Sequence, residues 1–372
     1  MANKGLLYLS EPRQATWLEL FFDLIFVVAL GKLTHLLAHT HHGHLSEGVW
    51  LHFLLAFPPM WWIWVGHTVC SNRFDADTRP HRIATLLLML LIMLASVQIE
   101  KISQNHVPFV LIYCTARLFI SGMYISAARR HPDEAQFAIR TSNTYLVGVL
   151  ISACSVLFEL PGAIIVFYAG ILFDMVGRKF IIGSTIPVDR DHLVERVGLL
   201  AIILLGESVI SISSGLTDMT WDTLTVVTAV LGFVFICMIW WIYFDSFPLL
   251  INSNRDIDGD AILYSQLLTY ISFATLANMI RHAILNDLNI GDFRLMIIAG
   301  MVMLYLGKQT AYFVNTPEYR RYIILNTITM LGISGLSLLL PTPQYIFFGV
   351  SFSMIVYIAM NYRAQIRLYG SV

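Results

Sequence analysis

The chain has 372 residues, of which 57% are hydrophobic and only 13% are charged, and its formal net charge is −1. A soluble protein of this length needs more charge to cover its surface, so the composition predicts a polytopic membrane protein and excludes an ordinary soluble domain. The sequence has no basic patch of the density that nucleic acid requires, so we expect no nucleic-acid partner. The four cysteines lie in apolar runs without a CxxC spacing, and we interpret them as small core residues.

Hydropathy along the chain predicts an all-α integral membrane protein with about twelve transmembrane helices. The predicted segments lie near residues 15–38, 48–70, 81–99, 107–127, 140–158, 161–177, 193–215, 222–246, 261–285, 292–314, 321–340 and 344–362. The first segment is too long for the core of a signal peptide and contains two acids, so we interpret it as a retained helix.

Lysine and arginine are concentrated at the two ends of the chain and in alternate loops. The odd-numbered loops contain only Lys101 and Arg294, whereas the even-numbered loops contain most of the others, and we count Arg196 among these loop charges. The N-terminus contributes Lys4 and Arg13, and the C-terminus contributes Arg363 and Arg367. Because cytoplasmic loops carry an excess of these residues, the asymmetry predicts that both termini are cytoplasmic and that the number of spans is even.

Two carboxylates, Glu19 and Asp23, lie one helical turn apart in the first segment. Residues four apart share a helix face, and a helix that enters the bilayer near Ala15 places these acids about 6 Å and 12 Å deep. Such a pair tends to share a proton or to hold a cation. In the structural alternative, Glu19 caps the first turn and Asp23 pairs with one arginine or lysine.

The chain resembles itself across its middle. Each copy combines a tryptophan pair with a later Ser-Asn-Arg triplet, Trp61-Trp62 with Ser71-Asn72-Arg73 and Trp240-Trp241 with Ser253-Asn254-Arg255. This pattern predicts two parallel six-helix repeats, residues 1–185 and 186–372, related by an axis along the membrane normal. The alternative is that the tryptophans belong to an interfacial aromatic belt.

Ten charged side chains lie within or at the edge of the predicted segments. The basic ones are Lys32, Arg117, Arg281, Arg294 and Lys308, and the acidic ones are Glu19, Asp23, Asp174, Glu207 and Asp245. This near-balance is what burial requires, because an unpaired charge is expelled from the membrane or neutralised. We expect His67, Asp174, Asp245 and Lys308 to lie at a depth similar to that of Asp23.

Glu207 lies near the middle of the seventh segment and shares a face with Ser211 and Ser214. In the functional interpretation, this carboxylate lies in a polar cavity and takes a proton or a cation. In the alternative, Glu207 forms an ion pair with Arg117, Arg281 or Lys308 that fixes the packing of the helices.

Histidines crowd the first outer loop, at positions His39, His41, His42 and His44. Imidazole clusters bind zinc or copper, which makes this loop a candidate metal site. Only Glu47 is available nearby to complete a site, so a solvated polar loop is the alternative. No Gly-rich phosphate loop, HExxH or GxSxG motif occurs, and we expect no cofactor.

Three stretches carry a resemblance to a known family. They are the run from Ala15 to Leu30, Trp61-Trp62-Ile63-Trp64 with its Asn72-Arg73-Phe74-Asp75 tail, and His192 to Gly198 leading to Leu205-Gly206-Glu207-Ser208. In this order they resemble the bacterial low temperature requirement A family over most of the chain. The resemblance implies a multi-pass protein of the bacterial cytoplasmic (inner) membrane and supplies no catalytic residues.

The first helix is also similar to the Phe-Ser-Asp signature of a two-repeat potassium channel family. Arg13, Phe22 and Asp23 stand in the corresponding places. The serine is absent, and the second half lacks the motif, so this likeness covers one helix.

We predict a transporter or channel for an ion, such as a proton or another cation, or for a small solute. The candidate site residues are Asp23, Glu19, Glu207, Ser211, Arg117, His67 and Lys308. The alternatives are a membrane-embedded enzyme that acts on a lipid or isoprenoid and a non-transporting scaffold in which every buried charge is paired structurally. The expected partners are the lipid bilayer, the ion or solute, and further copies of the chain in a homo-oligomer.

Overall fold

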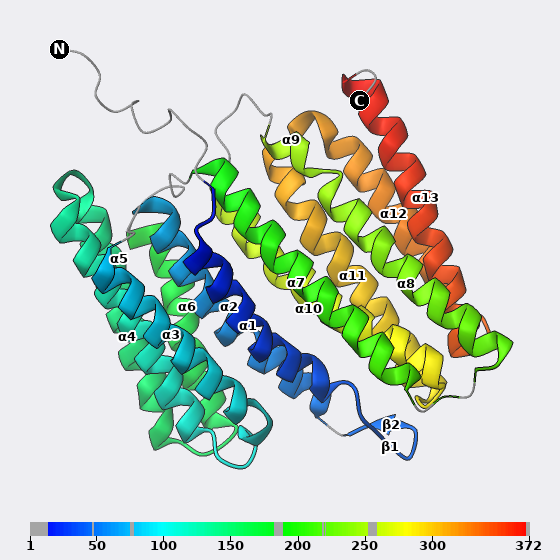
Figure 1. Cartoon of the computed structure of the whole chain (residues 1–372), viewed down its shortest axis with the longest axis horizontal. Helices are drawn as coiled ribbons and strands as arrows, with labels where there is room; N and C mark the ends of the chain where they lie inside the picture. The colour runs from blue at the N-terminus through cyan, green and yellow to red at the C-terminus, as the bar shows by residue number, and fades with distance from the viewer. Residues whose placement is uncertain are drawn as a thin grey trace. The chain divides into compact units, whose positions relative to one another are not determined.

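A computed structural model of the chain describes residues 14–46, 48–74, 78–181, 189–217, 219, 221–251 and 259–369. The described residues are helical apart from turns and one short β-hairpin (Figure 1). They form two compact units. The first contains Met1–Phe26 and Pro59–Leu200, and the second contains Val27–Pro58 and Ala201–Val372.

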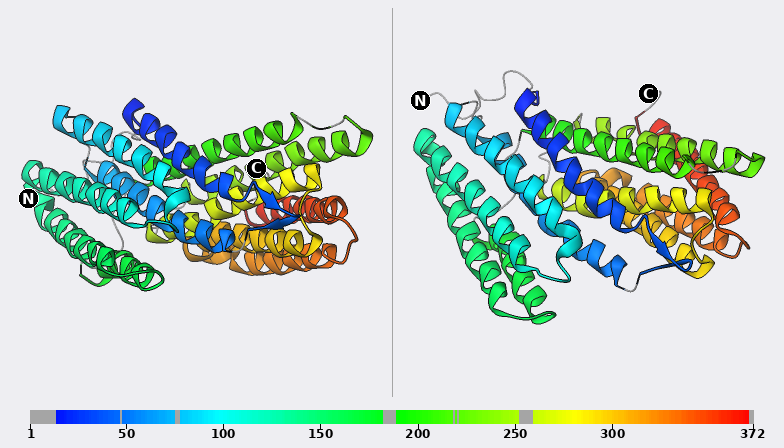
Figure 2. Two further views of the ribbon diagram at one scale, coloured as in Figure 1. Left: turned by 90° about the horizontal axis from the view of Figure 1, so that it is seen from below. Right: turned by 60° about the horizontal axis from the view of Figure 1, so that its bottom comes forward.

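Three helices contribute to both units, because the division falls within each of them: α1 (Trp17–Leu36), α2 (Val49–Arg73) and α7 (Arg190–Leu216). The other elements of the first unit are α3 (Arg79–Gln98), η2 (Ile99–Lys101), α4 (Val107–Arg130), η3 (Pro132–Glu134), α5 (Ala135–Cys154), η4 (Ser155–Leu157) and α6 (Gly162–Ile181). Helices α3 to α6 pack each on the next in chain order (Figures 1 and 2).

Small residues bring α5 and α6 into backbone contact. A Cβ atom on Gly170 would approach the backbone nitrogen of Ser152 to 2.7 Å, and one on Gly148 would approach the Gly170 carbonyl oxygen to 2.9 Å. Glycine, alanine and serine at such positions let membrane helices approach closely. This contact fixes α6, which carries Asp174 of the first unit.

The second unit contains the hairpin β1 (Thr40–His41) and β2 (His44–Leu45), with α8 (Thr223–Phe244), α9 (Phe247–Ile251), α10 (Gly259–Leu285), α11 (Ile290–Asn315), η5 (Pro317–Tyr319), α12 (Arg320–Ser337) and α13 (Pro343–Tyr369). Helix α10 lies against α11 and α8, and α13 lies against α12 and α8. A Cβ atom on Gly307 of α11 would approach the Thr269 backbone nitrogen to 2.6 Å, so α10 and α11 also meet through a small residue.

The helices bear out the predicted segments at the level of secondary structure. Within the described residues, twelve helices of 18 or more residues coincide with the twelve predicted segments. Seven helices of the described chain are long and apolar enough to cross a membrane. The chain is therefore a helical membrane protein with multiple apolar helices, whereas the count of twelve spans and the cytoplasmic termini stay predictions.

The two tryptophan pairs that suggested a repeat lie in different surroundings. Trp61 and Trp62 are buried, whereas Trp240 and Trp241 are 48% and 54% exposed. The first Ser-Asn-Arg triplet ends α2. The second triplet, the boundary between residues 185 and 186, Lys4 and Arg13 lie outside the described residues. The repeat therefore stays a prediction.

Candidate functional site

Glu19 completes a capping box at the start of α1. Its backbone N–H donates to Thr16 Oγ1 at 3.3 Å, while its carboxylate accepts from the Thr16 backbone N–H at 2.8 Å and from the Thr16 hydroxyl at 3.0 Å. Reciprocal bonds of this kind satisfy two backbone donors that a helix start otherwise leaves without partners. The positive end of the α1 dipole also favours a carboxylate here.

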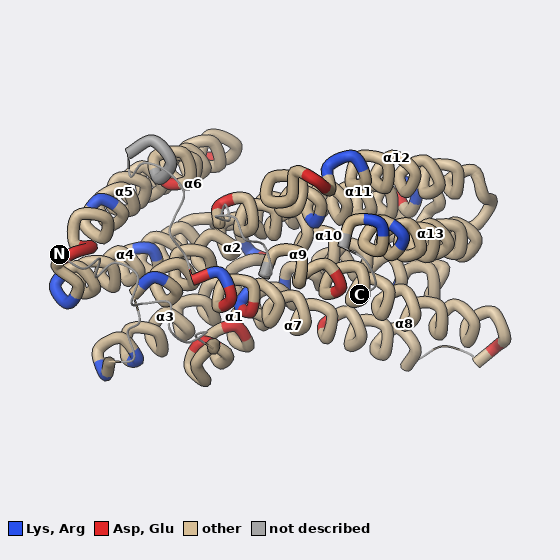
Figure 3. Tube along the Cα trace, turned by 90° about the horizontal axis from the view of Figure 1, so that it is seen from above, with Lys and Arg blue, Asp and Glu red and all other residues tan. Residues whose placement is uncertain are grey.

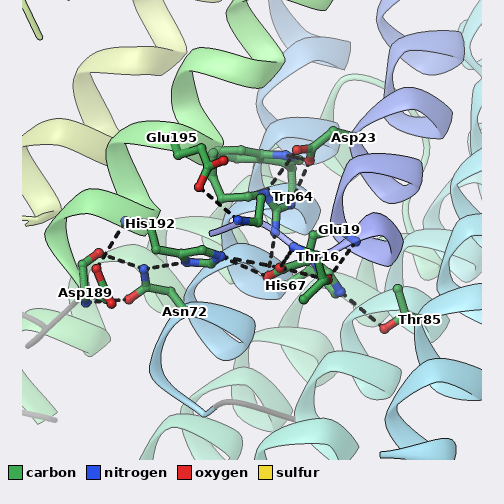
Figure 4. Close-up of polar contacts among 12 residues, drawn as sticks. Thr16, Glu19, Asp23, Trp64, His67, Asn72, Thr85, Asp189, His192 and Glu195 are labelled. Carbon is green, nitrogen blue, oxygen red and sulfur yellow. Dashed lines mark hydrogen bonds and ion pairs between the residues drawn. The ribbon is translucent and has the colours of Figure 1, made fainter. Parts of the chain in front are cut away.

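Asp23 lies one turn deeper and is held by a forked pair with Arg196 of α7 (Figure 4). Arg196 Nε donates to Asp23 Oδ2 at 3.0 Å, and Nη2 donates to Oδ1 at 2.7 Å. Trp64 Nε1 donates to the same carboxylate at 2.8 Å. The third guanidinium nitrogen, Nη1, lies 3.0 Å from Glu19 Oε1. A planar guanidinium matches carboxylates in this way, and lysine does not.

The Arg196 cluster, which we define as Glu19, Asp23 and Arg196, gathers two carboxylates around one guanidinium. The three side chains are 4%, 0% and 0% exposed, respectively. Hydrogen-bond donors of Thr16, Trp64 and Arg196 face the two carboxylates. Burial of charged groups is costly unless they are paired, and the shared guanidinium pairs with both acids.

A polar chain leads from the Arg196 cluster to the start of α7. Asn72 Oδ1 accepts from the Asp189 N–H at 2.9 Å, which fixes the amide so that Nδ2 faces His192 Nδ1 at 3.0 Å. The other ring nitrogen, Nε2, lies 3.3 Å from Glu19 Oε1. His192 therefore connects the start of α7 to the Arg196 cluster.

His67 lies beside the same cluster in a buried position (Figure 4). Its ring stacks on Phe22, the residue before Asp23, with centroids 3.8 Å apart. Its Nε2 lies 3.3 Å from Thr85 Oγ1, whereas Nδ1 has no hydrogen-bond partner within the described part of the chain. The imidazole thus offers a nitrogen that can take a proton.

Arg117 and Asp174 form a second buried pair in the first unit. Arg117 Nη2 donates to Asp174 Oδ2 at 2.8 Å, and Nη1 donates to the Trp62 carbonyl oxygen at 3.2 Å. The guanidinium lies 3.9 Å from the centre of the Tyr145 ring. One cation faces one carboxylate, so this pair is neutral and is enclosed by aromatic side chains.

Glu207 and Ser211 belong to the second unit and do not take part in the Arg196 cluster. Within the described residues Glu207 forms no ion pair with Arg117, Arg281 or Lys308, so the pairing that we considered is not observed. A Cβ atom on Gly31 would lie 3.2 Å from Glu207 Oε2, which places this half-buried carboxylate beside α1.

Lys308 is buried in the second unit among hydroxyl groups. Its Nζ donates to Ser246 Oγ at 2.9 Å and to the Tyr357 hydroxyl at 2.8 Å. Nζ also lies 5.1 Å from the Tyr312 ring centre. No described carboxylate lies within 4.0 Å of this ammonium. Asp245 instead accepts from Gln365 at 3.0 Å.

The histidines of the predicted first outer loop lie in and beside the β-hairpin of the second unit. His42 and Gly43 have φ values of 51° and 79°, as a tight two-residue hairpin turn requires, and they place His41 opposite His44. His44 Nδ1 lies 2.9 Å from Asp292 Oδ2, and His39 packs edge-on against His35. Among the described residues, no three or more His, Cys, Asp or Glu side chains are placed to hold a metal ion.

Sequence reasoning missed the central residue of the cluster. We counted Arg196 among the loop charges, and that assignment is wrong, because Arg196 lies within α7 and is buried. A signal was present: Asp189, His192 and Arg196 are spaced three and four apart, which puts three polar residues on one face of an otherwise apolar helix. Trp64 and Asn72 were noted only as parts of the repeat pattern.

Comparison with known proteins gives two findings. The family model of the bacterial low temperature requirement A protein matches residues 14–360. An uncharacterized protein of Rhizobium meliloti (strain 1021) is 26% identical over an alignment of 247 residues, and the match covers 63% of this chain. The match spans 59% of the length of that relative.

Proposed function

Given that the chain belongs to the bacterial low temperature requirement A family, we propose that it moves a proton or another cation, alone or coupled to a small solute, through the membrane. The Arg196 cluster is the proposed site of charge uptake. The observation that carries the proposal is the burial of two carboxylates, one helical turn apart, around one shared guanidinium.

Two buried carboxylates that lie one helical turn apart tend to share a proton or to hold a cation. His67 is the proposed proton acceptor, because its Nδ1 has no partner among the described residues and its ring stacks on Phe22. Asp23 is the carboxylate whose charge makes this uptake favourable.

His192 is the proposed relay for the proton. Its Nε2 lies 3.3 Å from Glu19 Oε1, and Asn72, which bonds the half-buried Asp189, holds the imidazole through Nδ1. Chains of acidic and histidine side chains are typical of proton relays in membrane proteins. In this proposal Glu19, which its capping box holds in place, is the end of the relay within the Arg196 cluster.

Flux measurements on the reconstituted full chain test the proposal. Vesicles that contain the protein receive inward gradients of H⁺, Na⁺ or K⁺ in separate arms, and the rise in the lumen is followed with ion-sensitive dyes. We expect at least one cation to enter faster than in empty vesicles, and D23N to lose most of that flux. D222N is the matched control, because Asp222 is an exposed helix cap of α8.

The outcomes separate transport from a structural role. If no cation moves, and no gradient drives uptake of a solute, the proposal is wrong. If wild type conducts and D23N conducts equally well, the cluster only stabilises the fold. Should D23N fail to fold, H67Q provides the test, because it removes the proposed proton acceptor and leaves the contacts of Arg196 in place.

A further inference from the structure

A groove of about 460 Å³ lies between α3 and α4 in the first unit. It begins where α3 starts and α4 ends, with His81 and Arg130 among its lining residues. Further along it is lined by apolar side chains and by small residues such as Gly122. The groove therefore has a basic end and an apolar body.

The length of the groove suits one leaflet of a bilayer. Its α4 lining runs from Arg130 back to Thr115, sixteen residues that rise by about 22 Å. A bilayer with its headgroup regions is about 40–45 Å thick, so a groove that starts among the headgroups runs the depth of one leaflet, about 20–22 Å. Both helices are long and apolar enough to cross a membrane.

The surface around the groove is apolar and accessible. Ile83 and Leu87 of α3 are 59% and 42% exposed, and Leu118 of α4 is 45% exposed. A Cβ atom on Gly122 would meet nothing within 4 Å, so the floor of the groove is open at its middle. Exposed aliphatic side chains on membrane-spanning helices are solvated by lipid tails.

At the basic end of the groove, no described carboxylate forms an ion pair with Arg130. Its Nη1 bonds Thr78 Oγ1 at 3.4 Å, and its Nε donates to the Ser126 carbonyl oxygen at 3.3 Å. The acids that follow in η3 are Asp133, which is exposed, and Glu134, whose carboxylate lies 2.7 Å from Arg73 Nε.

More basic side chains surround this end. Figure 3 shows lysine and arginine at the ends of α3 and α4. The arginines there are Arg79 and Arg82 in the first turn of α3 and Arg129 and Arg130 in the last turn of α4. A guanidinium and an imidazole at a membrane interface are suited to the phosphate of a lipid headgroup.

We propose that the groove between α3 and α4 binds a phospholipid with an anionic headgroup. The phosphate lies against Arg130 and His81, and one acyl chain follows α4 past Gly122. The site is independent of the Arg196 cluster, since none of its lining residues takes part in that cluster.

Photo-crosslinking tests this site in vesicles of phosphatidylcholine that contain the full chain. Phosphatidylglycerol with a diazirine in its acyl chain is the probe, and mass spectrometry maps the adducts. We expect adducts on α3 and α4 in the wild type. R130Q should lower their yield about fivefold, the effect of one arginine near an anionic membrane surface. R363Q changes an exposed arginine of α13 that is outside the lining, and it should leave the yield unchanged.

A steric pair tests the apolar body of the groove. G122L fills the groove and should abolish the adducts. G332L is its matched control, because Gly332 of α12 is also exposed with nothing near an added Cβ atom. Equal yields in G122L and G332L overturn the proposal.

Two further arms exclude other ligands. A phosphatidylcholine probe that labels α3 and α4 equally well shows an apolar groove without headgroup recognition, which overturns the proposal. Inorganic phosphate in excess should leave the labelling unchanged. If it prevents labelling, the basic end is a site for free phosphate, and the lipid assignment is wrong.

Discussion

Two buried arginines among the described residues of the first unit differ in the side chains that face them. Arg117 faces one carboxylate, Asp174, and is enclosed by Trp62 and Tyr145. Arg196 faces two carboxylates, Asp23 and Glu19. Both guanidinium groups are fully buried, so the two sites differ in the number of carboxylates that face the guanidinium and not in its exposure.

In the proposed function, this difference separates a structural role from a functional one. A buried pair of one cation and one carboxylate is complete as it stands, and its removal damages the fold. The second carboxylate of the Arg196 cluster is a further group that could take a proton in the proposed function. The polar path of His192, Asn72 and Asp189 leads to the Arg196 cluster, and nothing similar is observed at Arg117 within the described residues.

The largest effect is expected from removal of each arginine. R196M removes the guanidinium from two buried carboxylates, whereas R117M removes it from one. Breaking a buried ion pair costs about 3–5 kcal/mol, so R196M should lower the free energy of unfolding by more than R117M does. Thermal unfolding of the purified proteins in detergent measures the order. R196K serves if R196M does not fold, because lysine keeps the charge without the fork. Equal losses for the two methionine variants contradict the comparison.

Removal of one carboxylate should cost less stability at the Arg196 cluster than at the Arg117–Asp174 pair. D174N leaves Arg117 with no counter-charge and should cost about 3–5 kcal/mol. D23N leaves Arg196 paired with Glu19, so we expect only the loss of hydrogen bonds to a charged group, about 2 kcal/mol. The same unfolding assay compares the two. A larger loss in D23N than in D174N means that Glu19 does not keep Arg196 paired.

The smallest effect concerns the capping box. T16A removes the hydroxyl that bonds the Glu19 carboxylate and backbone, and should cost about 1 kcal/mol. T310A is the control, since the Thr310 hydroxyl is exposed and bonds only the Leu306 carbonyl oxygen of its own helix. Unfolding in detergent should show a clear shift for T16A alone. An equal shift in both variants indicates that the cap adds nothing at Glu19.

The helices could be predicted because their cause is local. Long apolar runs interrupted by turn residues are visible in the sequence, and each long described helix coincides with one of them. The capping box at Thr16 and Glu19 has a sequence signature as well, a threonine followed three residues later by glutamate. A cationic partner for Asp23 was one of the two interpretations that its buried position allowed.

The identity of that partner could not be predicted, because it depends on which helices meet. Arg196 is 173 residues from Asp23, and the polar residues that precede it in α7 made it resemble a loop charge. Arg117 and Asp174 were both expected to need a partner, but balance alone does not say which acid meets which base. Close contact of α5 with α6 through Gly148 and Gly170 brings Asp174 into place.

Proton uptake by the purified protein tests the central claim most directly. On titration from alkaline to mildly acidic solution, the wild type should bind about one proton more per chain than D23N, because D23N lacks the carboxylate that favours proton uptake by the Arg196 cluster. D222N should match the wild type. The Thr225 backbone N–H donates to Asp222 and lowers the pKa of that carboxyl, so Asp222 stays ionised throughout this range. Equal uptake by wild type and D23N contradicts the account.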